Sequence, residues 1–337
     1  MSELILAAVG NTSLVQLRQV VPKNGANIFA KLEWQNPTGS MKDRMALGLI
    51  SKMEAERRIK RGDTIIEYTG GSTGTSLAFV CGAKGYKMHA VSCKAFSQEK
   101  LDHMTALGAQ LTLVPYDGLG MRREMFLEMI AAAKKLASES NTFWVNQIEN
   151  PDTILGYKPL GEEIWKQTDG KVSAFVAAVG TGGTLAGVSK YLKEQTPKIQ
   201  IVCADPYGAA MWSWFTKGNL ETNDGDSIAE GIGQGRVTKN IEGTKVDRAY
   251  RVPDQTGLTI VYQLLREEGL FLGLSSGINV AGAVRFAKES GPGQTILTLL
   301  CDSGHKYQST LFNRDWLTSN HLDPDLPLES VLGAKAS

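Results

Sequence analysis

The sequence has few cysteines, no long apolar run and no excess of either charge. Its four cysteines form no CxxC pair and no zinc-ligand spacing, so we expect reduced, buried thiols and no metal site. No apolar run approaches the roughly 20 residues that a membrane-spanning helix needs. The first residues, MSELILAAVG, lack the basic segment of a signal peptide. We therefore expect a cytoplasmic protein with no role at a membrane.

Positive and negative side chains balance, with 36 Lys and Arg residues against 35 Asp and Glu residues. This balance gives no electrostatic reason to expect a nucleic-acid partner or an anionic membrane surface. Hydrophobic residues make up 42% of the chain and charged residues 21%, as in an ordinary globular protein. The length of 337 residues suggests about two domains.

Short apolar stretches alternate with stretches of helical periodicity along most of the chain. Examples are the strand-like runs KMHAVSC (87–93) and QTILTLLCD (294–302), and the helix-like run STGTSLAFVCGAKG (72–85). Repeated strand–helix units predict parallel sheets with helices on both faces. The runs FVAAV (175–179) and TILTLL (295–300) are apolar throughout, as strands covered on both faces are. The predicted fold class is α/β.

Three strand-to-helix turns are rich in glycine: TGGSTG (69–74), GTGGT (180–184) and SSG (275–277). GTGGT would bring backbone N–H groups and a helix N-terminus together, and Thr181 and Thr184 add hydroxyl donors. Such a turn binds an anion without a charged side chain. It lacks the lysine of a P-loop and the spacing of a dinucleotide-binding turn. The favoured anion is therefore a phosphate monoester.

Lys42, in NPTGSMKDR (36–44), lies where a helix is predicted to begin. The positive end of a helix dipole disfavours an ammonium, so a helix N-terminus in general favours the neutral form of a lysine. A lysine with a lowered pKa suits a Schiff base. Together with a monoester cradle elsewhere in the chain, Lys42 indicates pyridoxal phosphate. Taken alone, a lysine in a turn is more often a solvated surface charge.

The chain resembles the cysteine synthase family, the O-acetylserine sulfhydrylases and their relatives among fold-type II pyridoxal-phosphate enzymes. The resemblance runs from about Gly10 to Leu317 and rests on motifs in family order. These are KLEWQNPTGSMKDRMA, EYTGGSTGTSLA, NQIENPDTILGY, GTGGTLAG, EGIGQG, GLSSGINVAGA and DSGHKY. The first of them and GTGGTLAG are specific in combination, whereas each of the others is weak alone.

This resemblance implies two doubly wound domains with mainly parallel sheets, similar to the β subunit of tryptophan synthase. Residues 1–36 and 147–337 would form the larger domain, which binds the cofactor phosphate. Residues 37–146 would form a smaller, mobile domain with the Schiff-base lysine and the carboxylate-binding loop. A homodimer is also implied.

The resemblance also implies the roles of individual residues. Lys42 would form the Schiff base and act as general base, Ser72 would lie near the ring oxygen O3′, and Ser303 beside the pyridine nitrogen. The phosphate would be held by Gly180, Thr181, Gly182, Gly183 and Thr184. The substrate carboxylate would be held by Thr69, Gly70, Ser72, Thr73 and Gln147. A neutral hydroxyl at the pyridine nitrogen makes the ring a weaker electron sink than an aspartate would, which suits prompt β-elimination.

The implied reaction is a transferase reaction, β-replacement on a β-substituted L-alanine through an aminoacrylate intermediate. O-acetylserine is the default substrate and sulfide the default small nucleophile. Three alternatives remain open. The enzyme could stop at elimination, as a lyase or deaminase similar to cysteine desulfhydrase, or could use another leaving group or nucleophile. A non-catalytic relative is the third, although the intact Lys42 and Ser303 argue against it.

One loop departs from the family pattern. The family usually reads T-S-G-N-T-G where this chain has TGGSTG, so Gly70 replaces a serine and Ser72 an asparagine. We expect these changes to enlarge the space near O3′ and to favour a substrate bulkier or differently charged than O-acetylserine. Lys94 and Arg236 are candidates for contact with a charged substrate. His305 is a candidate for proton transfer because histidine side chains as a class suit that role.

Overall fold

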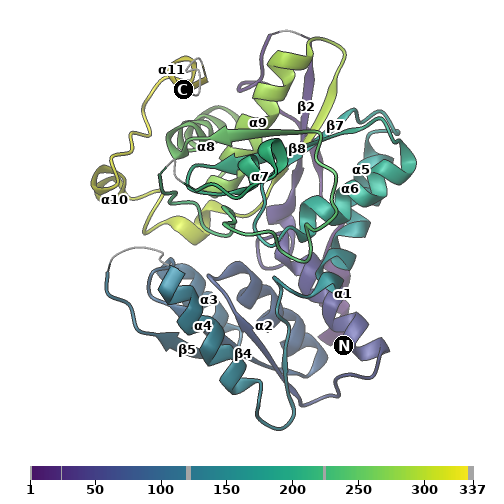
Figure 1. The fold of residues 1–337 in the computed structure, drawn as a ribbon, viewed down its shortest axis with the longest axis vertical. Helices are drawn as coiled ribbons and strands as arrows, with labels where there is room; N and C mark the ends of the chain where they lie inside the picture. Colours follow the sequence, from purple (N-terminus) through teal and green to yellow (C-terminus); the bar gives the residue numbers. More distant parts are fainter. Residues whose placement is uncertain (1, 24, 119–122, 223–224, 333–337) are drawn as a thin grey trace.

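The computed structural model describes residues 2–23, 25–118, 123–222 and 225–332, which form two sheets (Figure 1). The larger sheet is parallel except where β1 pairs with β2. Its strands in spatial order are β1 (Leu14–Gln16), β2 (Asn27–Leu32), β10 (Thr295–Leu300), β7 (Ala174–Ala177), β8 (Gln200–Pro206) and β9 (Arg248–Val252). The smaller sheet is parallel throughout. Its strands in spatial order are β5 (Gln110–Val114), β4 (Lys87–Cys93), β3 (Thr64–Tyr68) and β6 (Thr142–Trp144).

Helices follow most of the strands and cover the sheets. The α-helices are α1 (Lys42–Ala55), α2 (Ser72–Lys84), α3 (Gln98–Ala106), α4 (Arg123–Leu136), α5 (Lys158–Gln167), α6 (Gly183–Gln195), α7 (Met211–Lys217), α8 (Asp254–Glu268), α9 (Leu274–Ser290), α10 (Arg314–Ser319) and α11 (Leu328–Leu332). Short 3₁₀ helices are η1 (Ser2–Ala8), η2 (Glu33–Gln35), η3 (Pro151–Tyr157) and η4 (Gly304–Tyr307). We call the smaller sheet with α2, α3 and α4 the smaller lobe, and the larger sheet with α5, α6, α8, α9 and η4 the larger lobe.

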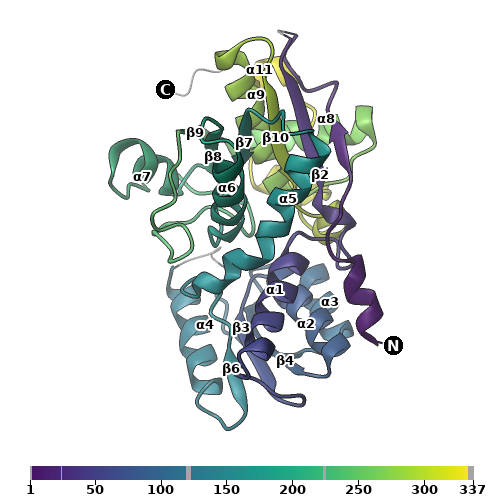
Figure 2. The same cartoon turned by 90° about the vertical axis from the view of Figure 1, so that its right-hand side faces the viewer.

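The larger sheet is buried on both faces, because successive side chains of a strand point to opposite sides. Phe175 and Leu297 pack in one apolar cluster with α5 and α6, whereas their neighbours Ala174 and Ile296 pack in another with α8 and α9. Figure 2 shows α5 and α6 on the side of the sheet that faces the viewer. The predicted α/β class with mainly parallel sheets is confirmed.

The chain passes from the larger sheet to the smaller one after β2 and returns after β6. The turn that carries Lys42 lies at the first of these crossings, and Gln147 lies at the second. The domain boundaries and the mobility of residues 37–146 stay predictions. All four cysteines are buried and unpaired, as predicted. Among the described residues, no helix is long and apolar enough to cross a membrane.

Candidate active site

Lys42 and the glycine-rich turn after β7 line the same hollow. Gly180, Thr181, Gly182 and Thr184 line it together with Lys42. The hollow lies beyond the C-terminal ends of the parallel strands β7 and β10. That is the edge of an open α/β sheet where ligands usually bind. The structure therefore brings together two motifs that lie far apart in the sequence.

Lys42 is the first residue of α1, as predicted. The turn before it is fixed from both sides. The N–H of Met41 donates to the carbonyl oxygen of Cys301 at 3.0 Å, and the N–H of Lys42 donates to the Ser40 hydroxyl at 3.2 Å. The Lys42 side chain is half-buried. A lysine anchored by its backbone, with its amine at a hollow, is positioned to bond covalently to a ligand there.

The turn GTGGT needs its glycines because other chain segments lie against it. A Cβ on Gly180 would lie 2.1 Å from the carbonyl oxygen of Gly231. Gly182 has a φ of +85°, and a Cβ there would lie 2.9 Å from the Cβ of Ile241. Since α6 begins at Gly183, the first N–H groups of this helix have no carbonyl partner within it. The turn therefore offers backbone donors to an anion in the hollow.

Three of the predicted carboxylate-binding residues meet at the start of α2. The Thr73 hydroxyl donates to the Gln147 side-chain oxygen at 2.7 Å. The Thr69 hydroxyl accepts the N–H groups of Gly71 at 3.0 Å and Gly74 at 3.3 Å. Glu67 holds the backbone of Gln147 in place by accepting its N–H at 2.9 Å. These side chains gather at the N-terminus of α2, and a helix N-terminus suits a carboxylate.

Asn240 joins this carboxylate group to the glycine turn. Its side-chain nitrogen donates to the carbonyl oxygen of Gln147 at 2.7 Å and to that of Thr181 at 3.0 Å. On the Lys42 side, the hydroxyls of Thr38 and Ser76 lie 3.3 Å apart and link the lysine turn to α2. The lysine turn, the GTGGT turn and the Thr73–Gln147 pair thus belong to one connected group of residues.

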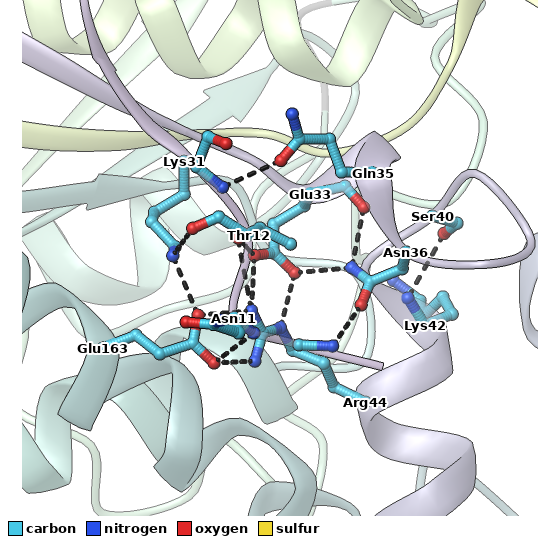
Figure 3. A network of polar contacts seen from close by, with 12 residues as sticks. Asn11, Thr12, Lys31, Glu33, Gln35, Asn36, Ser40, Lys42, Arg44 and Glu163 are labelled. Atoms are coloured by element: carbon cyan, nitrogen blue, oxygen red, sulfur yellow. Dashed lines mark hydrogen bonds and ion pairs between the residues drawn. The ribbon is translucent and has the colours of Figure 1, made fainter. Parts of the chain in front are cut away.

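A buried network of charges holds the turn before Lys42 in place (Figure 3). Arg44 donates to both oxygens of Glu33, at 2.6 and 2.9 Å, and to both oxygens of Glu163, at 2.7 and 2.8 Å. The ammonium of Lys31 lies 2.8 Å from Glu163. Asn36 completes the network by donating to Glu33 at 3.1 Å. Two cations therefore neutralise two carboxylates, which offsets much of the cost of burying them.

The expectation of extra space at Gly70 is wrong. A Cβ on Gly70 would lie 2.6 Å from a ring carbon of Phe96, so the ring fills the volume that a serine would use. Phe96 is itself buried and packs edge-on against Phe126, with ring centroids 6.3 Å apart. Phe96 could not be linked to Gly70 from the sequence, because the two residues meet only after β3 and β4 pair.

The remaining candidates do not line the hollow, although Ser303 contacts the lysine turn, where its N–H donates to the carbonyl oxygen of Gly39 at 3.1 Å. The Ser303 hydroxyl lies 2.8 Å from Nδ1 of His305, and neither residue is among those that line the hollow with Lys42. Lys94 is exposed. Arg236 is exposed and donates to the Tyr68 hydroxyl at 3.3 Å. The role predicted for Ser303 stays a prediction that these contacts do not support.

The hollow also contains the thiol of Cys301, for which the sequence motifs predicted no function. Cys301 lines it beside Lys42, and burial raises the pKa of this thiol to about 12. Asn279 donates to its sulfur at 3.2 Å, and the Ser276 hydroxyl accepts the backbone N–H of Cys301 at 2.9 Å. Ser276 lies in the SSG turn, so its motif was visible in the sequence. Asn240 lies in an aperiodic loop, where nothing distinguished it from other polar residues.

These residues fit pyridoxal phosphate. The glycine turn is a cradle that added Cβ atoms would obstruct, and its donors are neutral groups suited to a phosphate monoester. Lys42 lines the same hollow, so a covalent bond between its amine and the cofactor aldehyde is within the chemistry of the site.

Residues 5–302 match the model of a protein family described as "Pyridoxal-phosphate dependent enzyme". The chain belongs to this family of pyridoxal-phosphate-dependent enzymes. A cysteine synthase of Dictyostelium discoideum is 38% identical over 94% of this chain and 86% of its own length. The predicted resemblance to the cysteine synthase family is thereby confirmed.

Two solved structures extend the likeness to the fold. O-acetylserine sulfhydrylase isoform 3 from Entamoeba histolytica superposes with a TM-score of 0.84 and 31% identity, over 97% of this chain and 94% of its own. A structure of O-ureido-L-serine synthase gives a TM-score of 0.81 and 30% identity, over 98% of both chains.

Proposed function

We propose that this protein catalyses β-replacement on a β-substituted L-alanine, with O-acetylserine and sulfide as the substrates and cysteine as the product. One observation carries the proposal: Lys42 and the GTGGT turn line one hollow. Asn240 also connects that turn to Gln147 through hydrogen bonds. The cysteine synthases among the relatives support the choice of reaction.

Each group of residues has a separate task. Pyridoxal phosphate, when bound, supplies the electron withdrawal that weakens the bonds at the substrate α-carbon. Its phosphate would be held by Gly180, Thr181, Gly182, Gly183 and Thr184. Lys42 would hold the cofactor covalently and, when released, move the α-proton, because its amine then lies next to that carbon.

The substrate carboxylate would be held by the start of α2. Thr69, Ser72 and Thr73 would offer hydroxyls there, and Gln147 its side-chain amide. Gly70 has no side chain and would contribute only its backbone. The ring of Phe96 fills the space beside it. We also propose that the protein is a cytoplasmic homodimer, as the family resemblance implies.

The experiment adds O-acetylserine to the pure protein with bound cofactor, with and without sulfide, and measures cysteine and pyruvate. Cysteine that requires both substrates is the expected product, and Lys42→Ala serves as the inactive control. Pyruvate formed equally with or without sulfide would instead indicate a β-elimination lyase.

A different nucleophile is the second candidate, because O-ureido-L-serine synthase, named for another β-substituted alanine, shares this fold at 30% identity. Supplying sulfide or hydroxyurea alongside O-acetylserine separates the two. A higher kcat/KM with hydroxyurea would replace cysteine synthesis as the conclusion.

A further inference from the structure

A buried ion pair joins the two lobes beside the predicted carboxylate loop. The ammonium of Lys100, on α3 of the smaller lobe, lies 2.7 Å from a carboxylate oxygen of Glu230. Their side chains are 3% and 10% exposed. Glu230 precedes Gly231, whose carbonyl lies against the glycine turn and which lines the hollow with Lys42. Glu230 is therefore adjacent in sequence to a residue that lines the candidate site.

The alkyl part of Lys100 packs directly on the carboxylate loop. A Cβ on Gly71 would lie 2.4 Å from the Cδ of Lys100 and 2.7 Å from its Cβ. Gly71 has a φ of +142°, a backbone conformation that residues with a side chain rarely adopt. A glycine here therefore permits both this conformation and the close contact with Lys100. Lys100 thus touches the loop with its methylenes and the opposite lobe with its charge.

Two further contacts fix α3 to the larger lobe around Lys100. The Lys100 ammonium lies 4.1 Å from the centre of the Tyr307 ring, on η4, a distance at which a cation is attracted to an aromatic face. The adjacent Glu99 accepts the backbone N–H of Ser309 at 2.7 Å and its hydroxyl at 2.8 Å. In Figure 1, α3 lies on the side of the smaller lobe that faces the larger lobe.

We propose that Lys100 is a positioning residue, which holds the carboxylate loop in its substrate-binding arrangement through the ion pair with Glu230. The proposal rests on the proposed function for its substrate. The physical reason is that a buried charge that loses its partner is strongly destabilised. The two lobes are therefore held together at this point, and Gly71 is held with them. Lys100 does not reach the reacting atoms and acts only through the loop.

The test uses the protein with bound cofactor and measures hydrogen exchange in the peptide covering residues 69–77. Lys100→Met keeps the methylene packing on Gly71 but removes the charge, and Glu230→Gln removes the other partner. We expect exchange in this peptide to rise about tenfold in each variant, which corresponds to about 1.4 kcal/mol. We expect the double variant to be no worse than either single one, because both remove the same interaction.

The kinetic signature follows from the same role. KM for O-acetylserine should rise about tenfold while kcat changes little, since the loop binds substrate and transition state alike. Lys100→Arg, which keeps the charge, should restore most of the affinity.

The matched control is Lys84→Met, which breaks the Lys84–Glu54 pair, also 2.7 Å long, between α1 and α2. It should leave exchange and KM unchanged. Unchanged exchange in Lys100→Met and Glu230→Gln would overturn the proposal, as would an equal increase in Lys84→Met. Because exchange is measured without turnover, failure of the cysteine-forming activity would leave this test intact.

Discussion

The ring of Phe96 occupies the space beside Gly70 in which the family's serine side chain would lie. Three ring carbons would be 2.6, 2.9 and 3.0 Å from a Cβ at Gly70, closer than side-chain carbons pack. The two residues are consequently linked, and a change at one is tolerated only with a change at the other.

This relationship predicts the outcome of restoring the serine. Gly70→Ser should destabilise the protein by roughly 1–3 kcal/mol, as overpacking does. In the Phe96→Leu background, the same substitution should cost less, because the ring no longer opposes it. Urea unfolding of the four combinations measures the coupling, which we expect to be about 0.5–3 kcal/mol. Additive free energies would mean that the loop relaxes and that the contact does not constrain residue 70.

Gly182→Val should weaken cofactor binding without a comparable loss elsewhere. Its added Cβ would meet Ile241 and Thr238 at 2.9 and 3.0 Å, which would displace the turn and its N–H donors. Losing one charge-assisted hydrogen bond costs about 1.5–3 kcal/mol, or about 10- to 150-fold in affinity. Gly218→Val is the control, since Gly218 also has a positive φ, of +77°, but no atom of the described residues lies within 4 Å of an added Cβ. Equal cofactor affinity in both variants would show that the phosphate lies elsewhere.

Glu163→Gln should destabilise the fold and remove part of its acid sensitivity. Burial alone would raise the pKa of Glu163, but hydrogen bonds and charges from Arg44 and Lys31 lower it from 4.5 to about 2. A lowered pKa in the folded state gives a contribution that is present above pH 4.5 and is lost as pH falls toward 2. At pH 7 the variant should lose about 3–5 kcal/mol, as breaking a buried pair does.

Denaturant unfolding between pH 3 and pH 7 measures this difference. The neighbouring Glu162→Gln is the control, because Glu162 is exposed and pairs with the exposed Lys158 at 3.7 Å. A constant gap between wild type and Glu163→Gln across this range would contradict the assigned pKa.

The sequence predicted the parts of the fold that depend on local pattern. KMHAVSC became β4 and TILTLL became β10. The TILTLL run was recognisable because strands of a parallel sheet that are covered on both faces are mainly apolar. The short strands β1 and β6 were missed, since three residues carry no measurable alternation. The start of α1 at Lys42 was predicted from its turn.

The site was predictable only where a motif lies on one segment. Lys42 and the GTGGT turn were found in this way, and they line one hollow. Contacts between segments could not be read from the sequence. Phe96 against Gly70, Asn240 between Gln147 and Thr181, and Lys100 against Glu230 each join residues that the chain separates. The extra space predicted at Gly70 is absent for this reason, because Phe96 fills it.

The covalent role of Lys42 is the centre of this account, and borohydride tests it most directly. Reduction of the pure protein with bound cofactor should fix the cofactor on one lysine, which peptide mapping then identifies. We predict label on the peptide that contains Lys42, and none after prior displacement of the lysine by a β-substituted alanine. Label on any other lysine would contradict the account, because the hollow that Lys42 shares with the glycine turn would then not be the cofactor site.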